Sequence, residues 1–164
     1  MSCGLQVNTL RLLYETWNFA FVIRTATEND RDVWVKLRTL VYTDCSDEFH
    51  HEDVNLWLRD DGKACFLKEV DGSVVGFLEA SLRNVVDGCL TSPVGYMEGI
   101  CIFPEFRGRG YSKELISAAE DWMKAEGCTE MGSDSELENE SAIQFHKANG
   151  FDETYRIVQF KKKL

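Results

Sequence analysis

Apolar residues recur along the chain at two spacings, one typical of strands and one typical of helices. Residues 19–24 form an apolar, β-branched run, which predicts a first strand. Residues 29–41 place apolar side chains on one helical stripe behind an Asn-Asp pair that can cap a helix. An acidic loop at residues 44–48 follows, and a second, shorter helix is expected to end near the Asp-Asp-Gly turn at residues 60–62.

The middle of the chain has the pattern of a β-hairpin. Residues 64–70 and 73–82 are separated by Asp-Gly, a turn pair that favours two-residue hairpin loops. Residues 84–93 are then expected to form a loop, and residues 95–103 the next strand.

The C-terminal third alternates between helical and extended patterns. Its predicted elements are a turn at 104–110, a helix at 112–126, a short strand at 129–133, a helix from Asn139 to Gly150 and a final strand at 155–161. Because strands and helices alternate here while hairpins fill the middle, the sequence predicts an α/β fold (α+β) with a mixed sheet.

Length and charge restrict the class of protein. The 164 residues fit one domain, placed at residues 21–164 behind an N-terminal extension of unknown role at residues 1–20. The net charge of −10 disfavours nucleic acid and anionic membranes as partners and attracts polycations, although acidity alone also aids solubility. No apolar run is long enough to cross a membrane.

The cysteines argue against metal chemistry. All six are scattered, with no C-x-x-C pair and no grouping with the three histidines, so we expect no metal site. Free cysteines suit a reducing compartment, which predicts a cytoplasmic protein.

The most informative segment is residues 98–112, where a predicted strand enters a glycine-containing turn and then a helix. The first N–H groups of a helix lack internal partners and lie at the positive end of its dipole. Glycines let such a backbone approach a phosphate closely. The segment therefore either binds a pyrophosphate or forms only a tight strand-to-helix turn.

Gly99 adds a second signal, because an isolated glycine inside an apolar strand suggests a bulge. A strand that loses pairing there would expose the backbone of Ile100, Cys101 and Ile102 to an extended, amide-bearing ligand. Pantetheine is such a ligand, so a phosphate site and a free strand edge together favour coenzyme A.

These residues resemble the GCN5-related N-acetyltransferase (GNAT) superfamily, whose pyrophosphate signature is R/Q-x-x-G-x-G/A. Arg107, Gly110 and Ser112 fill it, with serine where glycine or alanine is usual. A second family element, an asparagine followed by F-Y-x-x-x-G-F, is matched by Asn139 and residues 145–151, where His146 replaces the common tyrosine.

The likeness is closer to the aminoglycoside 6'-N-acetyltransferases and spans roughly residues 22–163. It includes E-A-S-L-R at 79–83, D-G-C-x-x-S-P-V at 87–94, M-E-G-I at 97–100, C-T-E-M-G-S-D at 128–134 and G-F-D-E-T at 150–154. The resemblance implies a GNAT acyl-CoA N-acyltransferase fold, splayed around acetyl-CoA, and a homodimer. It also implies acetyl transfer to a cationic amine, with an aminoglycoside as the best candidate.

Carried over position by position, the resemblance assigns two sets of binding residues. The cofactor-binding set is Ile100, Cys101, Ile102, Arg107, Gly108, Arg109, Gly110, Tyr111, Ser112, Lys113 and Asn139. The acceptor-binding set is Tyr42, Val86, Glu98, Asp134 and Tyr155, of which Val86 and Tyr155 depart from the residues found in relatives.

Two residues are assigned catalytic roles. Glu98 is expected to bind the acceptor ammonium and accept its proton, and His146 to supply a proton to the departing thiolate. Other interpretations remain open: Glu98 as a solvated strand carboxylate, and His146 as a helix-end residue. For the whole chain, the alternatives are an acetyltransferase for a polyamine, another small amine or a peptide N-terminus, and a non-catalytic acyl-CoA-binding module.

Overall fold

The computed structural model describes residues 21–164, so the predicted N-terminal extension and the first two residues of the predicted first strand lie outside the described residues. The elements are β1 (Phe21–Thr25), the 3₁₀ turn Glu28–Asp30, α1 (Arg31–Arg38), α2 (Asp47–Trp57), β2 (Lys63–Val70), β3 (Ser73–Arg83), β4 (Val94–Ile102), the 3₁₀ turn Pro104–Phe106, α3 (Tyr111–Ala125), β5 (Met131–Ser133) and α4 (Glu140–Ala148). None of the helices in this described part is long and apolar enough to cross a membrane.

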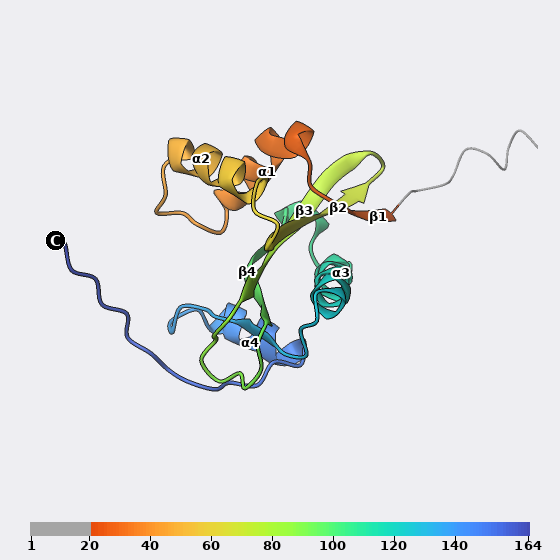
Figure 1. The fold of residues 1–164 in the computed structure, drawn as a ribbon. Helices are drawn as coiled ribbons and strands as arrows, with labels where there is room; N and C mark the ends of the chain where they lie inside the picture. Colours follow the sequence, from red (N-terminus) through yellow and green to blue (C-terminus); the bar gives the residue numbers. More distant parts are fainter. Residues whose placement is uncertain (1–20) are drawn as a thin grey trace, which may run out of the picture.

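One five-stranded sheet with the order β1-β2-β3-β4-β5 organises the domain. Its first four strands are antiparallel, whereas β5 runs parallel to β4. The sheet separates α1 and α2 on one side from α3 on the other (Figure 1). The predicted mixed α/β architecture is confirmed.

Each face of the sheet carries its own hydrophobic core, because successive strand residues point to opposite faces. Phe66 and Leu78 are paired across β2 and β3 and pack with the α3 cluster. Their neighbours Leu67 and Phe77 are also paired and pack with the α1 and α2 cluster, which includes the fully buried Leu37. Burying both faces fixes the register of the hairpin, since a one-residue slip would exchange the two sets.

The local signals at turns and caps mostly act as expected. Asp71 and Gly72 both have positive φ, at 52° and 75°, as the predicted hairpin turn requires. One expectation is wrong: residues 47 and 48 are not loop but open α2, because the Ser46 hydroxyl caps this helix by accepting from the Phe49 N–H at 3.2 Å.

The predicted final strand at residues 155–161 is also wrong, since these residues form neither strand nor helix. Beyond α4 the chain runs away from the sheet (Figure 1), and Tyr155 and Phe160 are 67% and 92% exposed. An alternating apolar pattern becomes a strand only where a sheet edge pairs with it, and no strand of the described chain does so here.

Candidate active site

The site lies where β4 and β5 part. They are paired only from Gly95 to Met97 on β4, and the last pair is Met97 with Ser133. Glu98 and Asp134 follow these two residues directly, so the two predicted carboxylates flank the point of separation. Polar groups at the ends of strands in open α/β sheets are well placed to meet a ligand.

Beyond the separation, β4 keeps only one sheet neighbour. Ile100, Cys101 and Ile102 pair with β3, and within the described residues no strand pairs with their other side. The predicted free strand edge is therefore present, and an extended ligand with amide groups could pair there.

A bulge at Glu98 coincides with this change in β4. Glu79 of β3 faces Gly99, but the next residue, Ala80, faces Met97, so Glu98 is the extra residue. The bulge expected near Gly99 is confirmed, and it directs Glu98 out of the regular alternation.

Tyr42, predicted to bind the acceptor, lies against the bulge. Its hydroxyl lies 3.1 Å from both the Glu98 carbonyl oxygen and a Glu79 carboxylate oxygen. A Cβ added to Gly99 would lie 2.4 Å from the same hydroxyl, so only glycine fits beneath it. Burial and the Glu79 charge raise the pKa of Tyr42, which keeps the phenol protonated and able to donate.

Behind Tyr42 is a buried polar network that sequence reasoning missed. The fully buried Glu79 carboxylate accepts from the Trp34 indole N–H at 2.6 Å and from Arg38, which also pairs with Asp53. Burial raises the pKa of Glu79, and the Arg38 guanidinium opposes that shift. The available signal was the i, i+4 spacing of Trp34 and Arg38, which places them on one face of α1, whereas Tyr42 lies beyond the end of that helix.

Glu98 is engaged by an arginine that was not among the predicted site residues. The Arg83 guanidinium donates through Nη2 to both carboxylate oxygens, at 2.8 and 2.7 Å, and Ser81 donates to one of them. Arg83 also stacks on Tyr96, whose hydroxyl donates to Asp134 at 2.5 Å. One chain of contacts therefore connects the two predicted acceptor-binding carboxylates.

His146 reaches the same place from α4. Its Nδ1 lies 2.7 Å from the Ala142 carbonyl oxygen, which can only accept, so Nδ1 carries a proton. Its Nε2 lies 2.9 Å from the Ser133 hydroxyl, which is also 3.0 Å from the Met97 carbonyl oxygen. The imidazole is thus joined to the last paired residues of β4 and β5 through Ser133, which sequence reasoning also missed.

The glycine turn before α3 is shaped for an anion. Gly108 and Gly110 have positive φ, at 74° and 82°, and nothing lies within 4 Å of a Cβ built on either. Gly110 is the N-cap and supplies no side-chain cap to the helix, which begins at Tyr111 rather than at the predicted Ser112. The first turn of α3, including Lys113, presents the positive end of the helix dipole here.

The two arginines of the turn brace it. Arg107 donates through Nε to the Ile102 carbonyl oxygen at 2.9 Å, and Arg109 donates to the Glu105 carbonyl oxygen at 3.3 Å. Each holds the turn with one edge of its guanidinium, which has further N–H groups to offer an anion.

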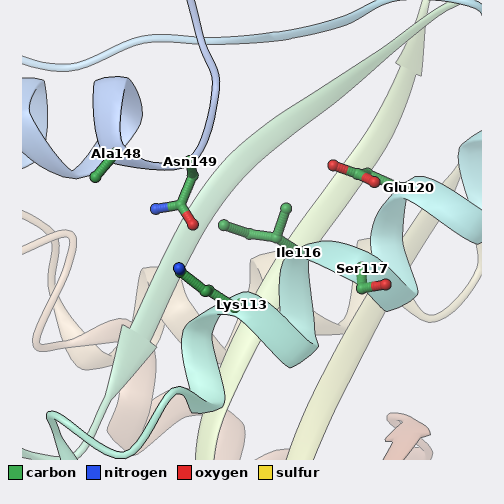
Figure 2. A pocket seen from close by; sticks show the side chains of 6 residues that line it. All are labelled: Lys113, Ile116, Ser117, Glu120, Ala148 and Asn149. Atoms are coloured by element: carbon green, nitrogen blue, oxygen red, sulfur yellow. The ribbon is translucent and has the colours of Figure 1, made fainter.

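A shallow, open pocket of about 280 Å³ lies between α3 and the end of α4 (Figure 2). Its lining begins with Lys113, one of the predicted pyrophosphate residues. The residues around it are Lys113, Ile116, Ser117, Glu120, Ala148 and Asn149.

Three predicted site residues form no hydrogen bond with the two predicted acceptor-binding carboxylates in the part of the chain that the structure describes. The Asn139 side-chain oxygen caps α4 by accepting from the Ala142 N–H at 3.0 Å, so its amide nitrogen is the group able to donate to a ligand. Val86 packs against Gly132 beside β5, where a Cβ would lie 2.7 Å from its Cγ1. Tyr155 lies on the exposed C-terminal segment, and no hydrogen bond or ring contact within the described residues joins it to the site.

A strand that parts from its parallel neighbour beside a bulge, followed by a glycine turn into a helix, is the architecture of an acyl-CoA N-acyltransferase fold. The chain belongs to the acetyltransferase (GNAT) family, whose model matches residues 31–151. This confirms the resemblance found in the sequence.

Relatives in that family carry a more specific name. The chain is 39% identical over 142 residues to the aminoglycoside N(6')-acetyltransferase type 1 of Salmonella typhimurium, covering 86% of this chain and 98% of the relative. It is also 39% identical over 144 residues to the enzyme of that name from Stenotrophomonas maltophilia, covering 87% and 93%.

Solved structures of enzymes with this activity have the same fold as the chain. Aminoglycoside N-acetyltransferase AAC(6')-Iy in complex with CoA superposes with a TM-score of 0.84 at 37% identity, covering 89% of this chain and 97% of that one. The same enzyme with a bisubstrate analogue, CoA-S-monomethyl-acetylneamine, gives a TM-score of 0.83 at 37% identity, covering 88% and 99%.

Proposed function

We propose that the protein transfers the acetyl group of acetyl-CoA to the 6'-amino group of aminoglycoside antibiotics. The observation that carries this proposal is the placement of Glu98 at the bulge, between the free edge of β4 and the second carboxylate, Asp134. Support also comes from relatives of that name, which the chain matches over nearly their whole length.

The residues present fit acetyl-CoA. The free edge at Ile100, Cys101 and Ile102 suits the amides of the pantetheine arm, and the turn at Gly108 and Gly110 suits the pyrophosphate. The remaining residues proposed to hold the cofactor are Arg107, Arg109, Tyr111, Ser112, Lys113 and Asn139. The bound cofactor supplies an activated thioester.

The acceptor side is acidic. Glu98 and Asp134 flank the parting strands, and the chain carries a net charge of −10, which draws a polycation toward the site. Tyr42 and Val86 border this region, whereas Tyr155 lies away from it on the exposed C-terminal segment.

The chemistry assigned to the residues is proton handling. An alkyl ammonium must lose a proton before its nitrogen can form the new C–N bond, and Glu98 is the base placed to take it. Breaking the C–S bond leaves a thiolate, and its proton would come from Nε2 of a doubly protonated His146, through the Ser133 hydroxyl that this nitrogen contacts. Positioned proton transfer of this kind contributes roughly 10²–10⁴-fold.

A mass-resolved assay with acetyl-CoA tests the proposal. Neomycin and paromomycin form a matched pair because they differ in an amino or a hydroxyl group at the 6' position. We expect the 6' amine to be acetylated in neomycin and Glu98→Gln to lower kcat. Acetylation confined to spermidine or to a peptide N-terminus would instead support one of the other acceptor classes, and cofactor binding without any transfer would support a binding module.

We further propose a homodimer. The C-terminal segment exposes large apolar side chains, including Tyr155, Ile157, Val158 and Phe160 at 63% to 92%, which a second copy could cover. Light scattering on the full chain and on a chain ending at residue 154 tests this. A full-length monomer would contradict it.

A cytoplasmic location is proposed on the cysteines. Five of them lie in the described residues, all are free, and Cys65, Cys101 and Cys128 are buried. Thiols without disulfide partners suit a reducing compartment. Fractionation of producing cells, followed by blotting, tests the assignment.

A further inference from the structure

The carboxylate proposed to hold the acceptor ammonium already holds a cation. One oxygen of Glu98 accepts from the Ser81 hydroxyl and from two guanidinium nitrogens of Arg83, Nε at 3.1 Å and Nη2 at 2.8 Å. The other oxygen accepts from Nη2 at 2.7 Å. A carboxylate oxygen accepts about two hydrogen bonds. An incoming ammonium would therefore have to share Glu98 with Arg83 or replace it.

Arg83 is held in a manner that permits replacement. Its guanidinium carbon lies 3.4 Å from the centre of the Tyr96 ring, and Tyr96 is only 6% exposed, so the arginine rests on a fixed platform. The Arg83 side chain itself is 41% exposed, however, and Glu98 is 24% exposed. The contacts to both Glu98 oxygens hold the guanidinium in place, but its exposure lets the arginine swing into water without crossing the core.

The platform also connects to the second acceptor carboxylate, since the Tyr96 hydroxyl donates to Asp134. An acceptor with several ammonium groups can contact Glu98 and Asp134 together. A monoamine can contact only one of them, and it gains little by exchanging one cation on Glu98 for another.

We propose that Arg83 is a built-in occupant of the ammonium position on Glu98, and that it lowers the affinity of every acceptor that uses Glu98, so that only an acceptor with further ammonium contacts binds tightly. The acceptor displaces the guanidinium, and the interactions that only a polycation makes offset the lost ion pair. The cost of displacing Arg83 is the same for both kinds of acceptor, so a monoamine is left with too few contacts to bind tightly. The inference rests on the proposed role of Glu98.

The test compares two acceptors on the full chain. Neomycin is the polycation, and methyl 6-amino-6-deoxyglucoside is a sugar with a single primary amine. Dissociation constants are measured by titration calorimetry with CoA-saturated protein, and kcat with acetyl-CoA, for wild type, Arg83→Gln, Glu98→Gln and the double variant. Arg59→Gln is the matched control, since it removes the same charge from an exposed position just after α2.

We expect Arg83→Gln to tighten the binding of both acceptors by up to about fivefold, because both are relieved of displacing the same ion pair. The change should disappear in the Glu98→Gln background, and Arg59→Gln should not produce it. If Arg83→Gln weakens binding and lowers kcat as Glu98→Gln does, Arg83 supports Glu98 and the inference is overturned.

The two proposals fail in different ways. If Glu98→Gln changes neither affinity nor kcat, the ammonium position is elsewhere, and the Arg83 inference falls although acetyl transfer stands. If wild type transfers no acetyl group, the proposed function falls, and the binding measurements still show whether Arg83 competes with a cation for Glu98.

Discussion

The contact between Gly99 and Tyr42 gives a sharp quantitative prediction for the bulge. Gly99→Ala would put a methyl group 2.4 Å from the Tyr42 hydroxyl oxygen, and ordinary contact begins near 3.4 Å. The hydroxyl must therefore recede by about 1 Å (3.4 minus 2.4), which disrupts its hydrogen bonds to the Glu98 carbonyl and to Glu79. Overpacking costs about 1–3 kcal/mol and a lost hydrogen bond about 1 kcal/mol, so we expect a loss of about 2–4 kcal/mol.

Removing the hydroxyl should relieve most of this penalty. In Tyr42→Phe the nearest atom to the new methyl becomes the ring carbon Cζ at 3.1 Å, which a small ring tilt accommodates. Tyr42→Phe alone should cost about 1–2 kcal/mol because buried Glu79 loses a donor. Adding Gly99→Ala to it should then cost little, so most of the cost of about 2–4 kcal/mol for Gly99→Ala should appear as coupling between the two substitutions.

Urea unfolding of wild type, both single variants and the double variant measures this coupling, and the KM for acetyl-CoA measures its effect on the strand edge. We expect Gly99→Ala to raise that KM, because the bulge sets the course of β4 toward Ile100, and the double variant to recover part of it. Additive free energies within about 0.3 kcal/mol would refute the argument that the hydroxyl is what excludes a side chain at residue 99.

Three further predictions concern the turn, a helix cap and acid stability. Gly110→Ala and Gly127→Ala both place a side chain at positive φ, 82° and 86°, with open space around it, so each should destabilise by about 1 kcal/mol. Only Gly110→Ala should raise the KM for acetyl-CoA, and an equal rise in Gly127→Ala would contradict a role for the turn. Asn139→Ala should lower the free energy of urea unfolding by about 1 kcal/mol, because α4 loses its cap. If the same variant also has a larger Kd for CoA, Asn139 contacts the cofactor as well. The Arg24 guanidinium lowers the pKa of Asp30 from 3.8 to about 2. The ionised carboxylate therefore stabilises the fold by about 2 kcal/mol above about pH 4, and this contribution is lost as the pH falls toward 2. Arg24→Gln should flatten that part of the stability curve, and an unchanged acid slope would count against the pair.

Local sequence signals predicted those elements whose form depends on residues close together in the chain. The Asp-Gly pair specified the hairpin of β2 and β3, and Asn139 specified the start of α4. Gly99 marked the bulge, because a glycine inside an apolar strand weakens regular pairing and leaves room for a close approach. The predicted strand at residues 155–161 failed for the complementary reason: its alternation is a strand pattern, but a strand needs a partner, and pattern alone does not supply one.

Partners distant in sequence could not be predicted in the same way. Trp34 and Tyr42 meet Glu79, 45 and 37 residues away, only because α1 packs across the sheet. Arg83 meets Glu98 because β3 and β4 are neighbours and the bulge reorients one residue. Ser133 meets His146 because α4 returns to the end of β5.

The sequence by itself determined the backbone features of this protein: the alternating elements, the free strand edge and the glycine turn all follow from periodicity and from residues with unusual conformational freedom. Only the tertiary structure decided how the polar side chains are paired. Charges and hydroxyls find partners across elements through packing, and packing depends on where each strand and helix comes to lie rather than on the residues beside it in the chain. Whether Glu98 meets an arginine or water is therefore a property of the folded domain.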